Sequence, residues 1–210
     1  MKKSVLLLLA LLIWALPLAG CARIDTAGLL DAAPALLERA AFFNEIYFGE
    51  GIPINPSGAS VGGYVVADQR YLDEHGFHTI DELKAKTEEV FSPGYCAAIY
   101  PAAFAGFAAE GGYIYARYSS SQAAALRDEN ETILVSAYNT GLLTKVGKTT
   151  YDYDSVRLIG TGRDYATVGV MATTDYYPTA DEPLGRTEVT ELEIRFVRVD
   201  GAWRIDSPTY

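Results

Sequence analysis

The residues of this chain that could do chemistry are few and scattered. Its only two histidines, His75 and His78, lie in the run Asp73-Glu74-His75-Gly76-Phe77-His78. A zinc site needs three or four ligands in a fixed geometry, and these two histidines fall on a predicted glycine-containing loop. The sequence also has no Gly-x-Ser-x-Gly elbow of the kind that carries a serine nucleophile. We therefore expect no metal, no cofactor and no catalytic set, and a chain that is not an enzyme.

The best candidates for binding are tyrosines and acidic residues on predicted strands. Asp152 and Asp154 flank Tyr153, and in a regular strand they would share one side. Paired carboxylates can share a proton or hold calcium, although exposed strand residues are usually only solvated. The predicted binding surface consists of Tyr113, Tyr115, Tyr151, Tyr153, Asp152 and Asp154. Packing in the core or at its rim is the alternative role for these tyrosines.

The chain contains only two cysteines, which limits their possible roles. Cys96 lies among apolar neighbours in Tyr95-Cys96-Ala97-Ala98-Ile99, so we expect a buried, unreactive thiol. Cys21 follows an N-terminal segment that begins with Met1-Lys2-Lys3 and continues as an apolar run of twelve residues, 5–16. This run is shorter than the roughly 20 residues of a membrane-spanning helix and is instead typical of a secretory signal.

Residues Leu18-Ala19-Gly20-Cys21 resemble the lipobox of bacterial lipoproteins. The resemblance implies that the Cys21 thiol receives a diacylglycerol, that residues 1–20 are removed, and that the new amine is acylated. It also implies an extracytoplasmic protein that is lipid-anchored to the bacterial cell membrane. The predicted organisation is a signal peptide (1–20), a lipidated tether (21–30) and one exported domain (31–210).

The charge of the chain limits its partners. The formal net charge is −10, and removal of Lys2 and Lys3 with the signal peptide takes it to −12. Such an acidic surface disfavours nucleic acid, whose binding depends on neutralising phosphates. Half of the residues are apolar, which predicts a folded core rather than disorder.

Helical patterns come first along the chain. Apolar residues at helical spacing predict a helix from Asp31 to about Phe48. Thr79 and Glu82 form a capping box at the start of a second helix, and Ser92-Pro93 can end that helix and begin a third that reaches Tyr100.

Alternating patterns follow and predict strands. Asp200-Gly201 is a strong two-residue hairpin turn because both positions tolerate positive φ. The expected strands are 64–67, 113–118, 132–138, 151–159, 165–173, 188–199 and 203–205. Helices followed by an antiparallel meander define an α+β domain.

Two resemblances refine this expectation. The element order and the ending Val199-Asp200-Gly201-Ala202-Trp203-Arg204-Ile205-Asp206 are similar to the cystatin-like, or nuclear transport factor 2-like, superfold. Phe77-His78-Thr79-Ile80-Asp81-Glu82-Leu83-Lys84, followed by Val90-Phe91-Ser92, resembles a segment of the DL-endopeptidase inhibitor (IseA-type) family. The first implies a curved antiparallel sheet, and the second implies an exported protein that restrains a cell-wall endopeptidase.

These observations together favour a non-catalytic binding module of the cell envelope, with a peptidoglycan hydrolase as its partner. Two alternatives stay open: a small-molecule binding protein that uses the concave sheet, and a cone-shaped isomerase-like enzyme with a tyrosine and an acid in its pocket.

We predict that Cys21 is the sole membrane anchor, so Cys21→Ser should abolish acyl labelling in cells. The mutant protein should be soluble or be held only by its uncut signal. Metabolic labelling with a fatty-acid analogue, followed by fractionation, measures both effects. Acyl label that persists in the mutant would contradict the assignment.

Overall fold

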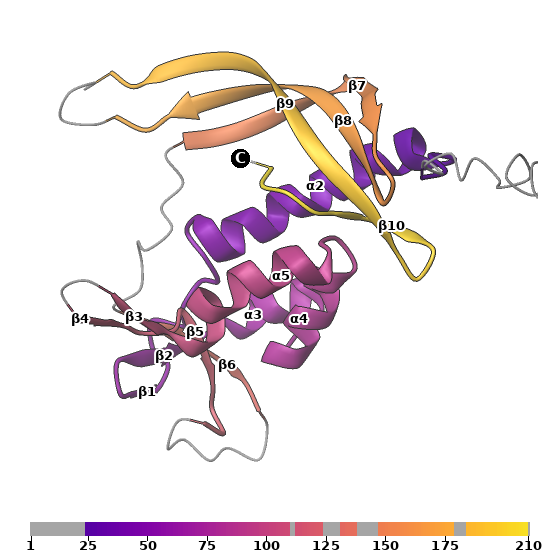
Figure 1. Ribbon diagram of the computed structural model, residues 1–210. Coiled ribbons are helices and arrows are strands. Elements are labelled where there is room, and N and C mark those ends of the chain that lie inside the picture. The colour runs from indigo at the N-terminus through magenta and orange to yellow at the C-terminus, as the bar shows by residue number, and fades with distance from the viewer. Residues whose placement is uncertain (1–23, 110–111, 124–130, 138–146, 179–183, 210) are drawn as a thin grey trace, which may run out of the picture.

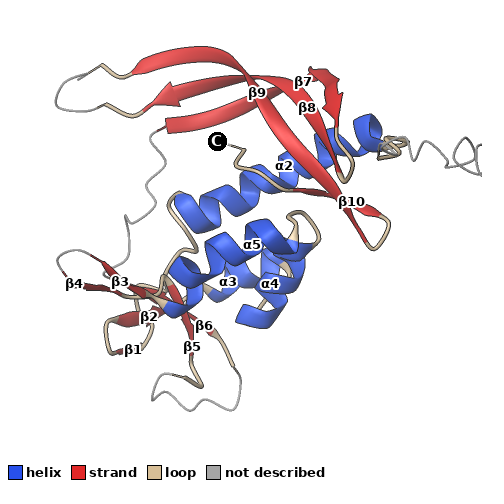
Figure 2. Cartoon of the chain, viewed as in Figure 1, coloured by secondary structure: helices blue, strands red, loops and turns tan. Residues whose placement is uncertain are grey.

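The chain folds as an α+β protein in which one long helix separates a large sheet from a second layer of helices and small sheets (Figure 1). The computed structural model describes residues 24–109, 112–123, 131–137, 147–178 and 184–209, without the side chains of 107, 109 and 112–114. Helices precede most of the strands, as the sequence predicts (Figure 2).

The long helix is α2, Leu29–Phe48. It begins after Gly28, whose φ is 70°, so Asp31 lies in its first turn rather than at its cap. The residues predicted to form its apolar face are buried: Leu36, Ala40, Phe43 and Tyr47. This stripe places α2 at the centre of the core.

Three shorter helices form the layer on one side of α2: α3 (Gln69–His75), α4 (Ile80–Glu88) and α5 (Pro93–Tyr100). The predicted capping box is confirmed, because the Thr79 side chain accepts from the Glu82 amide and the Glu82 side chain accepts from the Thr79 amide. Ser92 likewise caps α5, which continues into a short π-helix, η1 (Pro101–Ala105). The helix pair in the middle of the chain is therefore confirmed.

The sequence missed α3, and the expected loop around His75 is wrong. Asp68 accepts from the Arg70 amide at 2.9 Å and caps the helix, which ends at Gly76 with φ 64°. At seven residues, α3 is too short for helical periodicity to reveal it.

The large sheet is an antiparallel meander that curls over the other side of α2 (Figure 1). Its strand order is β10-β9-β8-β7, and the strands are β7 (Gly147–Thr161), β8 (Tyr165–Tyr176), β9 (Arg186–Val199) and β10 (Ala202–Ile205). Asp200 and Gly201 form the last turn with φ of 49° and 80°, as predicted. The inward-facing residues of β8 are fully or almost fully buried: Ala166, Val168, Val170 and Ala172.

Two smaller sheets lie on the far side of α2 from β7 (Figure 1). One has the order β1-β2-β6-β5, with β1 (Ser60–Val61), β2 (Tyr64–Val66), β6 (Ile133–Ser136) and β5 (Tyr118–Ser120). The other pairs β3 (Phe107–Ala109) with β4 (Gly112–Ile114). The single strand expected over 113–118 is therefore wrong: it divides between two sheets, and the described strands do not form one continuous meander.

The division of that strand brings two side chains to the C-terminal end of α2. The Arg117 guanidinium donates to the carbonyls of Tyr47 (2.9 Å) and Gly49 (2.6 Å), and the Tyr118 hydroxyl donates to the carbonyl of Ile46 (2.6 Å). The last carbonyls of a helix lack intrahelical donors and carry partial negative charge. A buried cation therefore both satisfies them and complements the helix dipole.

Replacing this cation should destabilise the whole fold. Arg117 is 5% exposed, so Arg117→Met would leave two carbonyls without their donor and should lower the free energy of unfolding by about 2–4 kcal/mol. Urea denaturation followed by circular dichroism measures the loss. Arg163→Met, at a side chain that is 83% exposed, is the matched control and should change stability by less than about 0.5 kcal/mol. A loss at Arg117 no larger than in this control would contradict the account.

Candidate binding surface

The acidic and tyrosine residues of β7 lie on an edge strand. β7 pairs only with β8 among the described strands, so its outer edge is not paired within the sheet. The pairing register jumps from Asp152↔Met171 to Arg157↔Gly169, so the four residues 153–156 lie opposite Val170 alone. Such a bulge bends an edge strand and re-aims its side chains.

Ser155 closes the gap that the bulge leaves in the hydrogen-bond ladder. Its Oγ accepts from the Met171 amide at 2.8 Å and donates to the Asp152 carbonyl at 2.5 Å. The bulge is thus held by hydrogen bonds, and it fixes the direction of the side chains on either side of it.

The bulge presents two carboxylates and one aromatic ring to solvent. Asp152 and Asp154 are both exposed, and Tyr153 between them is 39% exposed. Asp152 Oδ1 also accepts from the Asp154 amide at 3.2 Å. Because residues 152, 153 and 154 are all exposed, the regular alternation assumed for these residues does not hold across the bulge. Partial burial, together with the negative charge of Glu38 on α2, raises the pKa of Tyr153. We call Glu38, Asp152, Tyr153 and Asp154 the β7 surface.

Tyr151 points into the protein and supports this surface from beneath. Its hydroxyl donates to the carbonyl of Thr209, which fixes the C-terminal segment against β7. Its ring centroid lies 6.1 Å from that of Tyr153. Burial raises the pKa of Tyr151 to about 12. The residue therefore positions Tyr153 and packs at the rim of the core.

The remaining tyrosines of the predicted surface lie elsewhere. Tyr115 is 56% exposed and directly follows β4 in the sequence, and β4 lies on the far side of α2 from β7 (Figure 1). Tyr113 belongs to β4, but its side chain lies outside the described residues. The six predicted residues therefore do not form one surface. The structure brings Tyr151, Asp152, Tyr153 and Asp154 together, and it adds Glu38 from α2.

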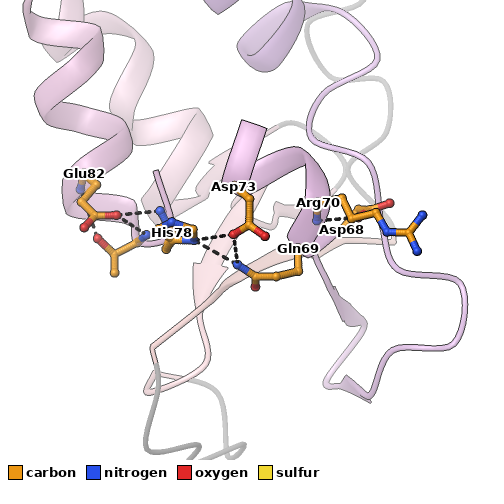
Figure 3. A network of polar contacts seen from close by, with 7 residues as sticks. Asp68, Gln69, Arg70, Asp73, His78 and Glu82 are labelled. Carbon is orange, nitrogen blue, oxygen red and sulfur yellow. Dashed lines mark hydrogen bonds and ion pairs between the residues drawn. The ribbon is translucent and has the colours of Figure 1, made fainter. Parts of the chain in front are cut away.

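The histidines join helices to one another. His78 Nδ1 lies 2.9 Å from Gln69 Nε2 and 3.6 Å from Asp73 Oδ1, so it bridges to α3 (Figure 3). Its backbone amide donates to Glu82 Oε2 at 2.6 Å, which lowers the pKa of that carboxyl group.

The other histidine packs among aromatic rings. The His75 ring centroid lies 4.6 Å from that of Phe42 and 4.3 Å from that of Tyr71. Within the described ranges, no group of three or more His, Cys, Asp or Glu side chains could hold a metal ion.

Cys96 has the environment that the sequence predicts. It is 2% exposed in the core, and burial raises the pKa of its thiol. A thiol with a raised pKa is a poor nucleophile at neutral pH, because the thiolate is the reactive form. The prediction of a buried thiol is therefore confirmed.

Comparison with known proteins does not extend these observations. Neither the protein-family models nor the curated proteins include a match to this chain. None of the helices in the described part of the chain is long and apolar enough to cross a membrane.

The contact made by Tyr151 predicts a pH-dependent stability. Because its pKa is raised from 10.0 to about 12, the protonated hydroxyl stabilises the fold fully below about pH 10, and this contribution is lost as the pH rises through about 12. Tyr151→Phe should cost about 1 kcal/mol at pH 8 through the lost hydrogen bond.

Urea denaturation of wild type and Tyr151→Phe at pH 8, 10, 11 and 12 tests this prediction. The stability margin of the wild type over the variant should shrink between pH 10 and 12, whereas a constant margin would contradict it. Tyr165→Phe, at a 41% exposed ring on β8, is the control and should match the wild type at pH 8.

Proposed function

We propose that this chain is a lipid-anchored, non-catalytic binding module of the bacterial cell envelope that restrains a peptidoglycan hydrolase. The exposed β7 surface carries the proposal, because it combines an aromatic side chain, three carboxylates and an edge strand. The lipobox-like residues ending at Cys21 support the location, and the resemblance of Phe77–Ser92 to the endopeptidase inhibitor family supports the partner class.

The β7 surface is suited to a protein partner. Tyrosine is enriched at interface hot spots because one face can bury apolar area while the hydroxyl still finds a hydrogen-bond partner. Tyr153 is held between Asp152 and Asp154, and Glu38 adds a further negative charge beside it. A partner of complementary chemistry presents an apolar patch ringed by lysine or arginine.

The pre-set geometry of the bulge also favours binding. Ser155 fixes the backbone of the bulge through its two hydrogen bonds, and the ring of Tyr151 supports the ring of Tyr153. Side chains ordered before association lose less conformational freedom on binding. The negative charge of the chain should also speed encounter with a basic partner, and this effect weakens as salt rises.

The inward face of the large sheet gives less support to the alternatives of a small-molecule binder or a cone-shaped enzyme. Val168, Val170, Ile194 and Phe196 on that face are each 0% exposed and belong to the same core cluster as α2. The helix therefore occupies the position where a ligand would sit over these strands. For this reason we place protein binding first.

The direct test is a titration of the purified domain, residues 22–210, into stem-peptide cleavage by the endopeptidases of the same envelope. We expect saturable inhibition of at least one endopeptidase, without consumption of the domain. Tyr153→Ala should weaken the inhibition by about tenfold or more, as removal of an interface hot spot does. Asp152→Asn keeps the acceptor of the Asp154 amide but removes the charge, and should mainly slow association.

Two matched variants make the result specific. Tyr165→Ala removes a ring of similar exposure on β8, and Asp164→Asn removes a carboxylate that is 86% exposed in the β7–β8 turn. Both should inhibit as the wild type does. Failure to inhibit any endopeptidase, together with saturable binding of a small apolar ligand, would overturn the proposal in favour of a ligand-binding protein.

A further inference from the structure

The start of the described chain is fixed to one end of the large sheet. The Ile24 amide donates to the Gly162 carbonyl at 3.2 Å, in the turn between β7 and β8. The Ala27 carbonyl accepts from Arg198 Nη2 at 3.0 Å and from Trp203 Nε1 at 3.3 Å, beside the turn between β9 and β10. We call residues 24–28, 162–164 and 198–203 the tether end.

Very little chain separates the tether end from Cys21. Only Ala22 and Arg23 lie between Cys21 and Ile24, so the two Cα atoms are at most about 11 Å apart in a fully extended chain. The headgroup region of a bilayer is itself about 5–8 Å thick on each side. A lipid on Cys21 would therefore hold the tether end within about one headgroup layer of the membrane surface.

We infer that the tether end rests on the phospholipid headgroups and sets the orientation of the whole domain. This inference depends on the lipid anchor of the proposed function. It needs no partner protein, because the short connection and the three hydrogen bonds determine which end faces the membrane.

The charges of the tether end fit this placement. Two arginines, Arg163 and Arg198, belong to this end, and Arg23 directly precedes it in the sequence. The same ranges contain an equal number of acidic residues: Asp25, Asp164 and Asp200. A mature chain with a charge of −12 would be repelled by anionic lipids through most of its surface. This balanced end is where such repulsion is small.

The orientation places the β7 surface above the lipid. Tyr153 precedes Gly162 by nine residues, which corresponds to about 25 Å of bulged strand. β8 ends and β9 begins at the opposite end of the large sheet from the β9–β10 turn (Figure 1). The β7 surface is thus held clear of the headgroups, where an envelope partner can approach it from the side.

Tryptophan fluorescence tests this orientation. Trp203 is the only tryptophan of residues 21–210 and lies at the tether end. The protein for this experiment consists of residues 21–210 with the substitution Cys96→Ala, so that Cys21 is its only thiol. A phospholipid with a maleimide group is attached to Cys21. The protein is then placed on phosphatidylcholine vesicles with or without a nitroxide on the lipid headgroup. We expect the nitroxide to quench Trp203 fluorescence.

Two variants show whether the short connection between Cys21 and Ile24 causes the quenching of Trp203. A twelve-residue Gly/Ser insertion between Arg23 and Ile24 keeps the anchor but allows a reach of about 20 Å, so quenching should be lost. Trp203→Phe with Val189→Trp moves the probe to a 63% exposed position in the far half of β9, where no quenching is expected. Circular dichroism confirms that each variant is folded.

The outcomes separate this inference from the proposed function. The inferred orientation would be overturned if the nitroxide did not quench Trp203 in the protein without the insertion. It would also be overturned if the insertion left the quenching unchanged, or if a tryptophan at position 189 were quenched. The chemically attached lipid supplies the anchor whether or not cells acylate Cys21. Loss of acylation in cells, or of hydrolase inhibition, would contradict the proposed function and leave this result unchanged.

Discussion

The rest of the structure depends on one constraint: α2 is buried on two opposite sides, against the layer of shorter helices and against the large sheet. The Tyr47 hydroxyl lies 2.8 Å from Thr87 Oγ1 of α4, and the Phe43 ring lies 6.4 Å from Phe91. Asn44 Nδ2 donates at 2.8 Å to Thr209 Oγ1 of the C-terminal segment beside β7. One helix therefore joins both layers. Arg117 and Tyr118 satisfy its last carbonyls, which allows that end to be buried.

The sequence predicts elements whose signals are local. The capping box at Thr79 and Glu82 and the turn at Asp200-Gly201 each depend on the chemistry of a few adjacent residues, and the structure has both. The alternating pattern of β8 also predicts its buried face. The α+β class follows from these elements, because the order of helices and strands can be read without knowing their contacts.

Features set by long-range contacts were not predictable. The strand expected over 113–118 breaks because Arg117 turns toward carbonyls about 70 residues earlier in the chain. The bulge at 153–156 depends on Ser155 reaching Met171, and no residue pattern in β7 signals it. The position of Glu38 beside Tyr153 was not predictable for the same reason, whereas Tyr153 and its flanking aspartates were predicted binding residues that the structure places together.

The central claim is that the β7 surface meets a cell-wall endopeptidase, and hydrogen–deuterium exchange tests it most directly. Amide exchange of the lipid-free domain should be compared with and without a bound endopeptidase. The account predicts added protection in residues 152–157 of β7 and in the α2 turn around Glu38, with no change in the β9–β10 turn. Protection confined to other strands, with β7 unchanged, would contradict it.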